Sequence, residues 1–89
     1  MAAEPAFQLR VVTDDGVALS TEAVSVVAPG ELGYLGILAN HAPLLTTLTG
    51  GRLTFRTPDG ASHARQLGAG LLEVHRNVVT ILTDRAEPA

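Results

Sequence analysis

The stretch FQLRVVTDDGVALSTEAVSVVA, residues 7–28, alternates apolar and polar side chains with a period of two. Phe7, Leu9 and Val11 are separated by polar residues, as expected for a strand with one buried face. The residues DDG at 14–16 form a turn signal, because aspartate bonds its own backbone in tight reversals and glycine accepts a positive φ. The extended pattern then resumes in VALSTEAVSVVA. The stretch therefore predicts strands on both sides of a short turn.

The same period continues along the rest of the chain. Leu53 and Phe55 alternate with polar residues in RLTFRT, the turn signal PDG follows, and SHARQL, GAGLLEV and VVTILTD are further short extended runs. HARQLGAGLLEV is the best helix candidate, but Gly68 and Gly70 would each destabilise a helix by roughly 1 kcal/mol relative to alanine. We therefore predict an all-β fold, a flattened β-sandwich or barrel of eight to ten short strands that forms a single domain over residues 1–89.

The composition excludes disulfides and thiolate metal sites, because the chain has no cysteine. The N-terminal MAAEPAFQLR has an acid and a proline where a signal peptide needs a cationic segment and a long apolar one. No apolar run approaches the ~20 residues of a membrane-spanning helix. We expect a soluble protein on the cytosolic side that is not itself inserted in a membrane.

The charge pattern argues against nucleic acid as a partner. The net charge is -3, and the six basic residues are arginines dispersed along the chain. One tyrosine and two phenylalanines are too few for a base-stacking platform. Without a basic stripe or stacking aromatics, nucleic-acid binding is not expected.

No group of residues is spaced for catalysis or metal binding. The histidines lack a second ligand at local spacing, and we interpret His63 and His75 as solvated strand or turn residues. Asp14 and Asp15 are turn formers, since adjacent strand residues point to opposite faces. The glycines of PGELGYLG lack the Lys-Ser/Thr and the helix of a phosphate loop. We predict no catalytic residue, metal, cofactor or small-molecule substrate.

The stretch PGELGYLGILANHAPLLT, residues 29–46, is better explained as a docking loop. Its glycines permit tight reversals, and Asn40 can cap a turn through its own side chain. Leu32, Tyr34 and Leu35 are large apolar side chains in a loop that should face water. Exposed apolar residues on a shaped loop indicate a contact with another protein.

Three motifs in a fixed order resemble a known family. GILANHAPLL at 36–45 is followed by GLLEV at 70–74 and VTILTD at 79–84. Over about residues 7–87 the chain resembles the ε subunit of F-type ATP synthase, in its N-terminal β-sandwich domain. The resemblance implies a non-catalytic rotor subunit that links γ to the ring of c subunits and couples ion flow to ATP synthesis. It also implies a peripheral position at the cytoplasmic face of the cell membrane.

Matched position by position, the resemblance implies two contact surfaces. The c-ring-facing residues are Glu31, Leu32, Tyr34 and Leu35, within a loop from Gly30 to His41, and the γ-facing residues are Thr13, His41, Thr46 and Gly68. Many members of the family place an acidic residue where this chain has Tyr34. An arginine of the ring could therefore be met by Glu31 or by the ring and hydroxyl of Tyr34.

Members of the family usually continue into two antiparallel helices that regulate hydrolysis and, in some members, bind ATP. This sequence ends at TDRAEPA, so either the natural protein is a short form or the sequence is one part of a longer protein. The resemblance implies that these 89 residues couple without binding ATP and without inhibiting hydrolysis. Two alternatives are a small β-barrel adaptor that binds a peptide at a strand edge, and a small hydrolytic or metal enzyme.

Overall fold

The computed structural model describes residues 4–89, and in this range the chain forms ten short strands and no helix. The number of strands agrees with the prediction. The strands are β1 (Phe7–Thr13), β2 (Gly16–Ala23), β3 (Ser25–Gly30), β4 (Gly33–Leu38), β5 (Leu44–Leu48), β6 (Gly51–Arg56), β7 (Ser62–Leu67), β8 (Gly70–His75), β9 (Val78–Thr83) and β10 (Ala86–Pro88). The helix candidate HARQLGAGLLEV falls in β7 and β8, on either side of a bend at Gly68 and Ala69.

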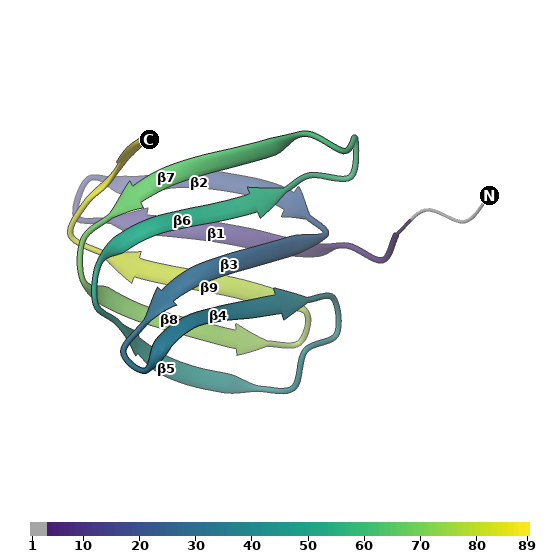
Figure 1. Cartoon of the computed structure of the whole chain (residues 1–89), viewed down its shortest axis with the longest axis horizontal. Helices are drawn as coiled ribbons and strands as arrows, with labels where there is room; N and C mark the ends of the chain where they lie inside the picture. The colour runs from purple at the N-terminus through teal and green to yellow at the C-terminus, as the bar shows by residue number, and fades with distance from the viewer. Residues whose placement is uncertain (1–3) are drawn as a thin grey trace.

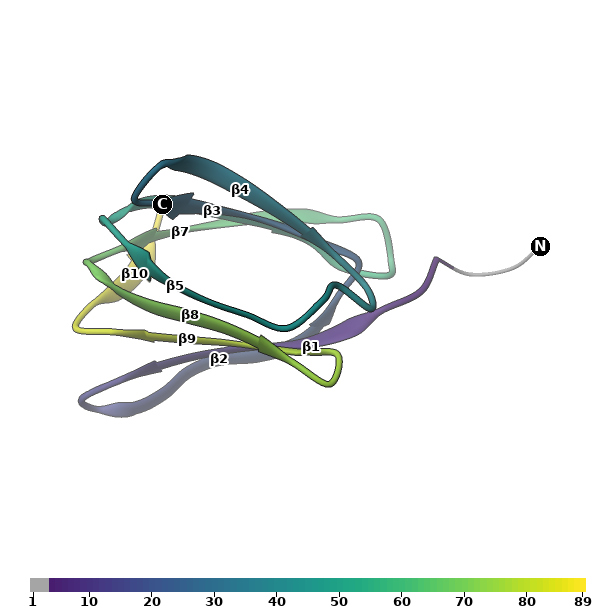
Figure 2. The same ribbon diagram turned by 90° about the horizontal axis from the view of Figure 1, so that it is seen from below.

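The strands form two packed layers, so the predicted β-sandwich is confirmed (Figures 1 and 2). One layer holds β4, β3, β6, β7 and β10, and the other holds β5, β8, β9, β1 and β2. Neighbouring strands are antiparallel except β1 and β9, which run parallel. The layers are joined at one corner, where Gly30 of β3 pairs with Leu48 of β5. The sandwich is therefore open on two sides, with β4 and β5 as the edges of one side and β2 and β10 as those of the other.

The core lies between the layers and follows the period of two seen in the sequence. Phe7, Leu9 and Val11 are buried while the residues between them are exposed, and Leu53 and Phe55 are buried in the same way. The remaining buried members of the cluster are Ala23, Val26, Ala28, Ile37, Leu48, Leu67, Leu72, Val74, Val79 and Ile81. Both layers contribute to this single cluster, which holds the two sheets face to face.

The corner between the layers depends on two glycines and a proline. Gly50 and Gly51 have φ angles of 88° and 137°, which residues with a Cβ rarely adopt, and they turn the chain from β5 into β6. Pro29 lies in β3 between the part that pairs with β6 and the part that pairs with β5. A proline is tolerated there because the missing N–H has no ladder partner to lose. Its carbonyl accepts a hydrogen bond from the Thr49 N–H at 3.1 Å.

The opposite end of the sandwich is fastened by Asn77. Its Oδ1 accepts the Asn40 N–H at 2.7 Å, and its Nδ2 donates to the Ala6 carbonyl at 2.9 Å. Asn77 and Asn40 both have φ near +60°, in the left-handed region that asparagine tolerates. We expected Asn40 to cap its turn through its own side chain, and the described contacts assign that role to Asn77. The β4–β5 turn, the β8–β9 turn and the segment before β1 are thus joined by one amide.

Gly70→Ala should lower the free energy of unfolding by about 2 to 4 kcal/mol. A Cβ at Gly70 would lie 1.9 Å from the Leu82 carbonyl oxygen, so β8 and β9 would have to separate locally. Gly36→Ala is the matched control in a strand, because a Cβ at Gly36 meets nothing within 4 Å. Urea unfolding followed by circular dichroism measures both variants. Equal midpoints for the two variants would contradict the close approach at Gly70.

One ion pair fastens the chain ahead of β1 to β6. The Arg56 guanidinium donates to both carboxylate oxygens of Glu4, at 2.7 and 2.8 Å. The hydrogen bond from Arg56 holds the pKa of Glu4 below its ordinary value, with the opposite charge adding to the effect. The pair is exposed, so its contribution to stability at neutral pH is small.

The Glu4–Arg56 pair should make stability fall with acid. A carboxylate whose pKa is depressed by folding stabilises the fold above its unfolded pKa of about 4.5, and this contribution is lost as the pH falls through the folded value. Glu4→Gln removes the titrating group and should flatten this part of the stability curve below about pH 4.5. Urea midpoints between pH 7 and pH 3 provide the measurement, and parallel curves for the two proteins would rule the contribution out.

Candidate docking surface

The expected loop from Gly30 to His41 is largely a β-hairpin, which corrects the prediction. Glu31 and Leu32 alone form the turn, and β4 follows at once, paired residue by residue with β3. The regular pairing explains the glycines at both ends of the turn, since Gly33 has a φ of 120°. The predicted site residues therefore lie on a rigid hairpin.

The four residues of the predicted ring-facing set point in different directions. Leu32 is fully exposed at the tip of the turn, and Tyr34 is two-thirds exposed. Leu35 is half-buried and packs against the core, so its predicted exposure is wrong. The reason is the alternation within β4, which turns Leu35 inward and Tyr34 outward. A Cβ at Gly30 would lie 2.6 Å from Leu35 Cδ2, so Leu35 fills the space beside that glycine.

Tyr34 lies across the outer face of its layer. It pairs with Pro29 of β3, and its hydroxyl lies 3.7 Å from the position that a Cβ of Gly51 would occupy. The tyrosine side chain therefore extends over β3 toward β6 and away from the tip of the turn. Glu31 and Leu32 are left as the residues at that tip.

Glu31 is held in place by the other layer. The Thr47 hydroxyl donates to Glu31 Oε2 at 2.5 Å, and the Glu31 N–H donates to the Thr47 carbonyl at 3.3 Å. Thr47 belongs to β5, so the β3–β4 turn is bonded across the corner of the sandwich. A carboxylate with its position fixed in this way is suited to meet a cation from outside.

The four predicted γ-facing residues do not form one patch. Thr13 ends β1, and Gly68 lies close by, because both lie beside Asp84. His41 is exposed in the turn after β4, at the end of the sandwich that Asn77 fastens. Thr46 is half-buried and turned inward, since it pairs with the buried Leu72.

An exposed apolar row, which the sequence-based predictions do not include, crosses the outer face of the second layer. In the strand pairing, Val17 lies opposite Val12, Val12 opposite Leu82, and Leu82 opposite Leu71. The row ends at Thr47, which lies opposite Leu71. We call these residues the apolar row. Val17, Leu71 and Leu82 are 55%, 41% and 49% exposed, and a hollow of about 430 Å³ lies along the row beside Gly70.

Apolar doublets in the sequence are the signal that could have revealed this row. The pairs Val11–Val12, Leu71–Leu72 and Ile81–Leu82 interrupt the alternation, so one member of each faces the core and the other faces out. Leu44–Leu45 in β5 repeats the pattern, and Leu45 is 68% exposed beside the row. Three neighbouring strands, β5, β8 and β9, thus each expose one large apolar residue, and Val12 of β1 is half-buried beside them.

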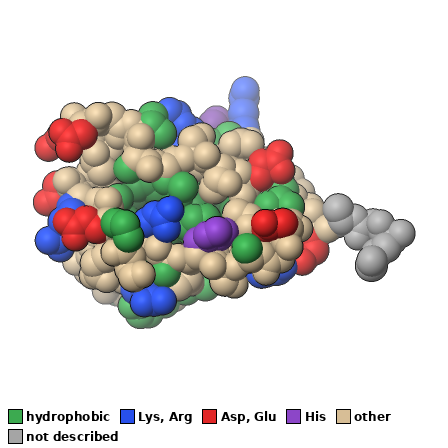
Figure 3. Space-filling view, turned by 90° about the horizontal axis from the view of Figure 1, so that it is seen from above, with side chains coloured by type: hydrophobic (Ala, Val, Ile, Leu, Met, Phe, Trp, Pro, Cys, Tyr) green, Lys and Arg blue, Asp and Glu red, His purple; other side chains and the backbone are tan. Residues whose placement is uncertain are grey.

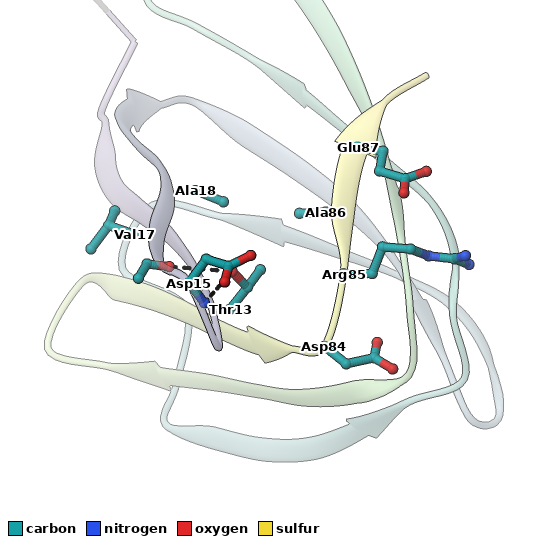
Figure 4. A pocket seen from close by; sticks show the side chains of 9 residues that line it. Thr13, Asp15, Val17, Ala18, Asp84, Arg85, Ala86 and Glu87 are labelled. Atoms are coloured by element: carbon teal, nitrogen blue, oxygen red, sulfur yellow. Dashed lines mark hydrogen bonds between the residues drawn. The ribbon is translucent and has the colours of Figure 1, made fainter.

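A second hollow, of about 340 Å³, separates the β1–β2 turn from the C-terminal segment (Figure 4). Asp15 lies on the turn, whereas the side chains of Asp84, Arg85 and Glu87 extend to the far side of the segment. Ala18 and Ala86 face the space between. Within residues 4–89 no three His, Asp or Glu side chains are grouped to hold a metal ion. This hollow offers no concentrated charge for a ligand.

The histidines have different surroundings. His75 is exposed, as expected, but His63 is half-buried and stacks on Phe55 with ring centroids 5.1 Å apart, so its predicted solvation is wrong. Its Nε2 lies 3.3 Å from the Thr57 hydroxyl. The same face of β7 carries Arg65, whose guanidinium lies 5.9 Å from the Phe55 centroid. His63 and Arg65 of β7 thus cover the ring of Phe55, a core residue of the neighbouring strand β6.

In the part of the chain that the structure describes, no helix is long and apolar enough to cross a membrane.

Known proteins resemble this chain in sequence and in fold. Residues 6–89 match the family model of the ATP synthase Delta/Epsilon chain, beta-sandwich domain. ATP synthase epsilon chains of Moorella thermoacetica and Desulfitobacterium hafniense are 44% and 45% identical, over 89% and 92% of this chain. The matched parts make up 59% and 61% of those relatives, so this chain spans about three-fifths of their length. These matches do not favour the adaptor alternative.

A solved structure of Euglena gracilis mitochondrial ATP synthase, described as OSCP/F1/c-ring, contains a chain of similar fold. The TM-score is 0.87 over 98% of this chain and 56% of that one, with 24% identity. A Tetrahymena thermophila mitochondrial ATP synthase structure, described as central stalk/c-ring, gives a TM-score of 0.79 at 17% identity, over 98% of this chain and 69% of that one. Both likenesses support the two-layer fold.

Thr47→Val should loosen the β3–β4 turn and leave the sandwich folded. The substitution keeps a β-branched side chain but removes the hydroxyl that donates to Glu31, an exposed hydrogen bond worth at most about 1 kcal/mol. Backbone ¹⁵N relaxation should show Glu31 and Leu32 more mobile on the nanosecond timescale. Thr54→Val, in the other layer, is the control. Unchanged order parameters at Glu31 would mean that Thr47 does not hold the turn.

Proposed function

Because the chain belongs to the ATP synthase delta/epsilon-chain β-sandwich family, we propose that it is a non-catalytic part of the central stalk of an F-type ATP synthase. In this role it binds the γ subunit through the outer face of one layer and the c ring through the Glu31–Leu32 turn. Its location is peripheral, at the cytoplasmic face of the membrane. It transmits rotation between the two partners and takes no part in the chemical step.

The observation that supports γ binding is the apolar row. Leu71, Leu82 and Val17 expose large side chains on the outer face of β8, β9 and β2, and Leu45 of β5 extends the patch. Covering such side chains contributes roughly 25 cal/mol per Å² of apolar surface. The three central strands behind the row, β8, β9 and β1, are each hydrogen-bonded to a strand on both sides, which holds this face in place. A partner helix or sheet can therefore bind without ordering a loop.

Among the four predicted γ-facing residues, Thr13 fits this surface best. It lines the hollow beside the row together with Asp84, and Gly68 also lies beside Asp84. His41 lies at the far end of the same layer, so it would extend the contact along β5. Thr46 faces inward, so it would not touch γ itself and would contribute only by packing under the strand that presents Leu45.

The contact with the c ring is assigned to the tip of the β3–β4 hairpin. Glu31 supplies a carboxylate in a position fixed by Thr47, and Leu32 supplies a fully exposed apolar side chain. Of the two candidates for an arginine of the ring, Glu31 is favoured over Tyr34, because Tyr34 extends over Pro29 and away from the tip.

The two contacts share one mechanical connection. Thr47 ends the apolar row and also binds Glu31 through its hydroxyl and its carbonyl. A force applied at the turn therefore reaches the γ-facing layer through hydrogen bonds to β5 as well as through the chain. This arrangement suits a part that carries torque between two partners.

Leu71→Ser with Leu82→Ser should weaken binding to the γ subunit by at least about tenfold, since both side chains would lose contact area at the centre of the patch. Both residues are well exposed, so the free energy of unfolding should change by less than about 1 kcal/mol. Isothermal titration calorimetry with purified γ measures the affinity. Leu38→Ser is the control, because Leu38 is 65% exposed on the other layer. Unchanged affinity in the folded double variant would refute the row as the γ contact.

A further inference from the structure

The free edge of β4 lacks the features that usually keep strand edges apart. Its sequence GYLGIL has no charge and no proline, and it pairs with β3 through six consecutive residues without a bulge. Edge strands normally carry a charge, a proline or a bulge, because an unpaired row of N–H and C=O groups can bind another strand. In the described part of the chain β4 pairs with β3 alone.

The other open side of the sandwich has that protection. Its edges carry Glu22 in β2, and Glu87 and Pro88 in β10. Figure 3 looks onto this side and shows acidic and basic side chains spread across it. On the side of β4, the neighbouring edge strand β5 reads LLTTL and is uncharged as well. The uncharged edge strands β4 and β5 therefore differ from the edge strands β2 and β10 of the same domain.

The backbone groups available on this edge follow from the turn. Gly30 and Gly33 flank a two-residue turn, so they form a hydrogen-bonded pair of the β3–β4 ladder. Alternation then directs the N–H and C=O groups of Leu35 and Ile37 toward β3. Pro29 fits this pattern, because its carbonyl points the opposite way, to Thr49.

The intervening residues Tyr34, Gly36 and Leu38 therefore present their backbone groups to the free edge. We propose that this edge is a self-association site, where the β4 strands of two copies pair antiparallel about a two-fold axis through Gly36. In this register Gly36 lies opposite Gly36 of the second copy, and Tyr34 lies opposite Leu38. All three pairs are of the hydrogen-bonded kind, so they form six N–H···O bonds and join two layers into one continuous sheet.

Side chains and charges are compatible with this pairing. Nothing lies within 4 Å of the Cβ position of Gly36, so the centre of the edge is open. Leu38 is 65% exposed and would gain cover beside the backbone and Cβ of Tyr34. The same register brings the Glu31 turn of each copy toward the His41 turn of the other, so that like charges do not meet.

The contact is small, which sets its strength. One strand pair covers less than the roughly 1,200 to 2,000 Å² of a stable interface, so we expect a dissociation constant of about 0.1 mM. The association goes beyond the proposed function and does not rest on it, because the apolar row belongs to the other layer.

The test is sedimentation equilibrium of the 89-residue chain from about 10 µM to 1 mM. Gly36→Lys places two lysines face to face on the axis and should raise the dissociation constant at least about tenfold. Ser20→Lys adds the same charge on the opposite edge and should leave it unchanged. A chain that stays monomeric to 1 mM, or two variants that behave alike, would overturn the proposal.

Amide exchange identifies the strand and the register. Protection of Tyr34, Gly36 and Leu38 should rise with protein concentration, whereas Leu35 and Ile37 should be protected at every concentration through β3. Gly36→Lys should abolish the concentration dependence and leave Leu35 and Ile37 protected, which shows that the variant is folded. A dimer in which the exchange of Gly36 does not change with concentration would place the contact elsewhere and refute the proposal.

Discussion

Each strand of this sandwich has only two faces, and one of them must cover the core. That constraint determines more than the interior. Where the sequence places two large apolar residues in succession, as at Val11–Val12 and Ile81–Leu82, burying one turns the other toward the outer face. Because β1, β9 and β8 are neighbours, the exposed members align in a single row. The surface proposed for γ is thus the outer counterpart of the core, formed by the same strands.

The turn at Glu31 and Leu32 depends on a different feature, the corner at which the layers meet. Gly50 and Gly51 let β5 run into β6 within a short reversal, and this brings Thr47 against the end of β3. Thr47 then bonds Glu31 while its strand neighbour across the ladder is Leu71. The bond to Glu31 crosses the corner between the layers, whereas the pairing with Leu71 lies within the second layer. The short connection between the layers therefore couples the Glu31–Leu32 turn closely to β5.

Local patterns are sufficient to predict the all-β fold, the DDG and PDG turns and the buried positions of β1 and β6, because period and turn chemistry are properties of neighbouring residues. They were not sufficient for Asn77, whose amide joins residues 37 and 71 positions away. The apolar row was missed for the same reason, since the parallel pairing of β1 with β9 brings distant segments together. A loop would not distinguish Leu35 from Tyr34, and only the hairpin register separates them.

The proposed γ contact and the proposed pairing of β4 strands use different layers of the sandwich, and this separation has a consequence for assembly. A copy bound through β4 still exposes its apolar row, whereas its Glu31 turn lies next to the second copy. Self-association would therefore compete with the c ring for the hairpin while leaving the γ-facing layer accessible. Mass action favours the partner that binds more tightly. A β4 dimer with a dissociation constant of about 0.1 mM would dissociate when a partner with a larger interface binds the hairpin. An unprotected edge can therefore be tolerated in a subunit that functions inside a complex.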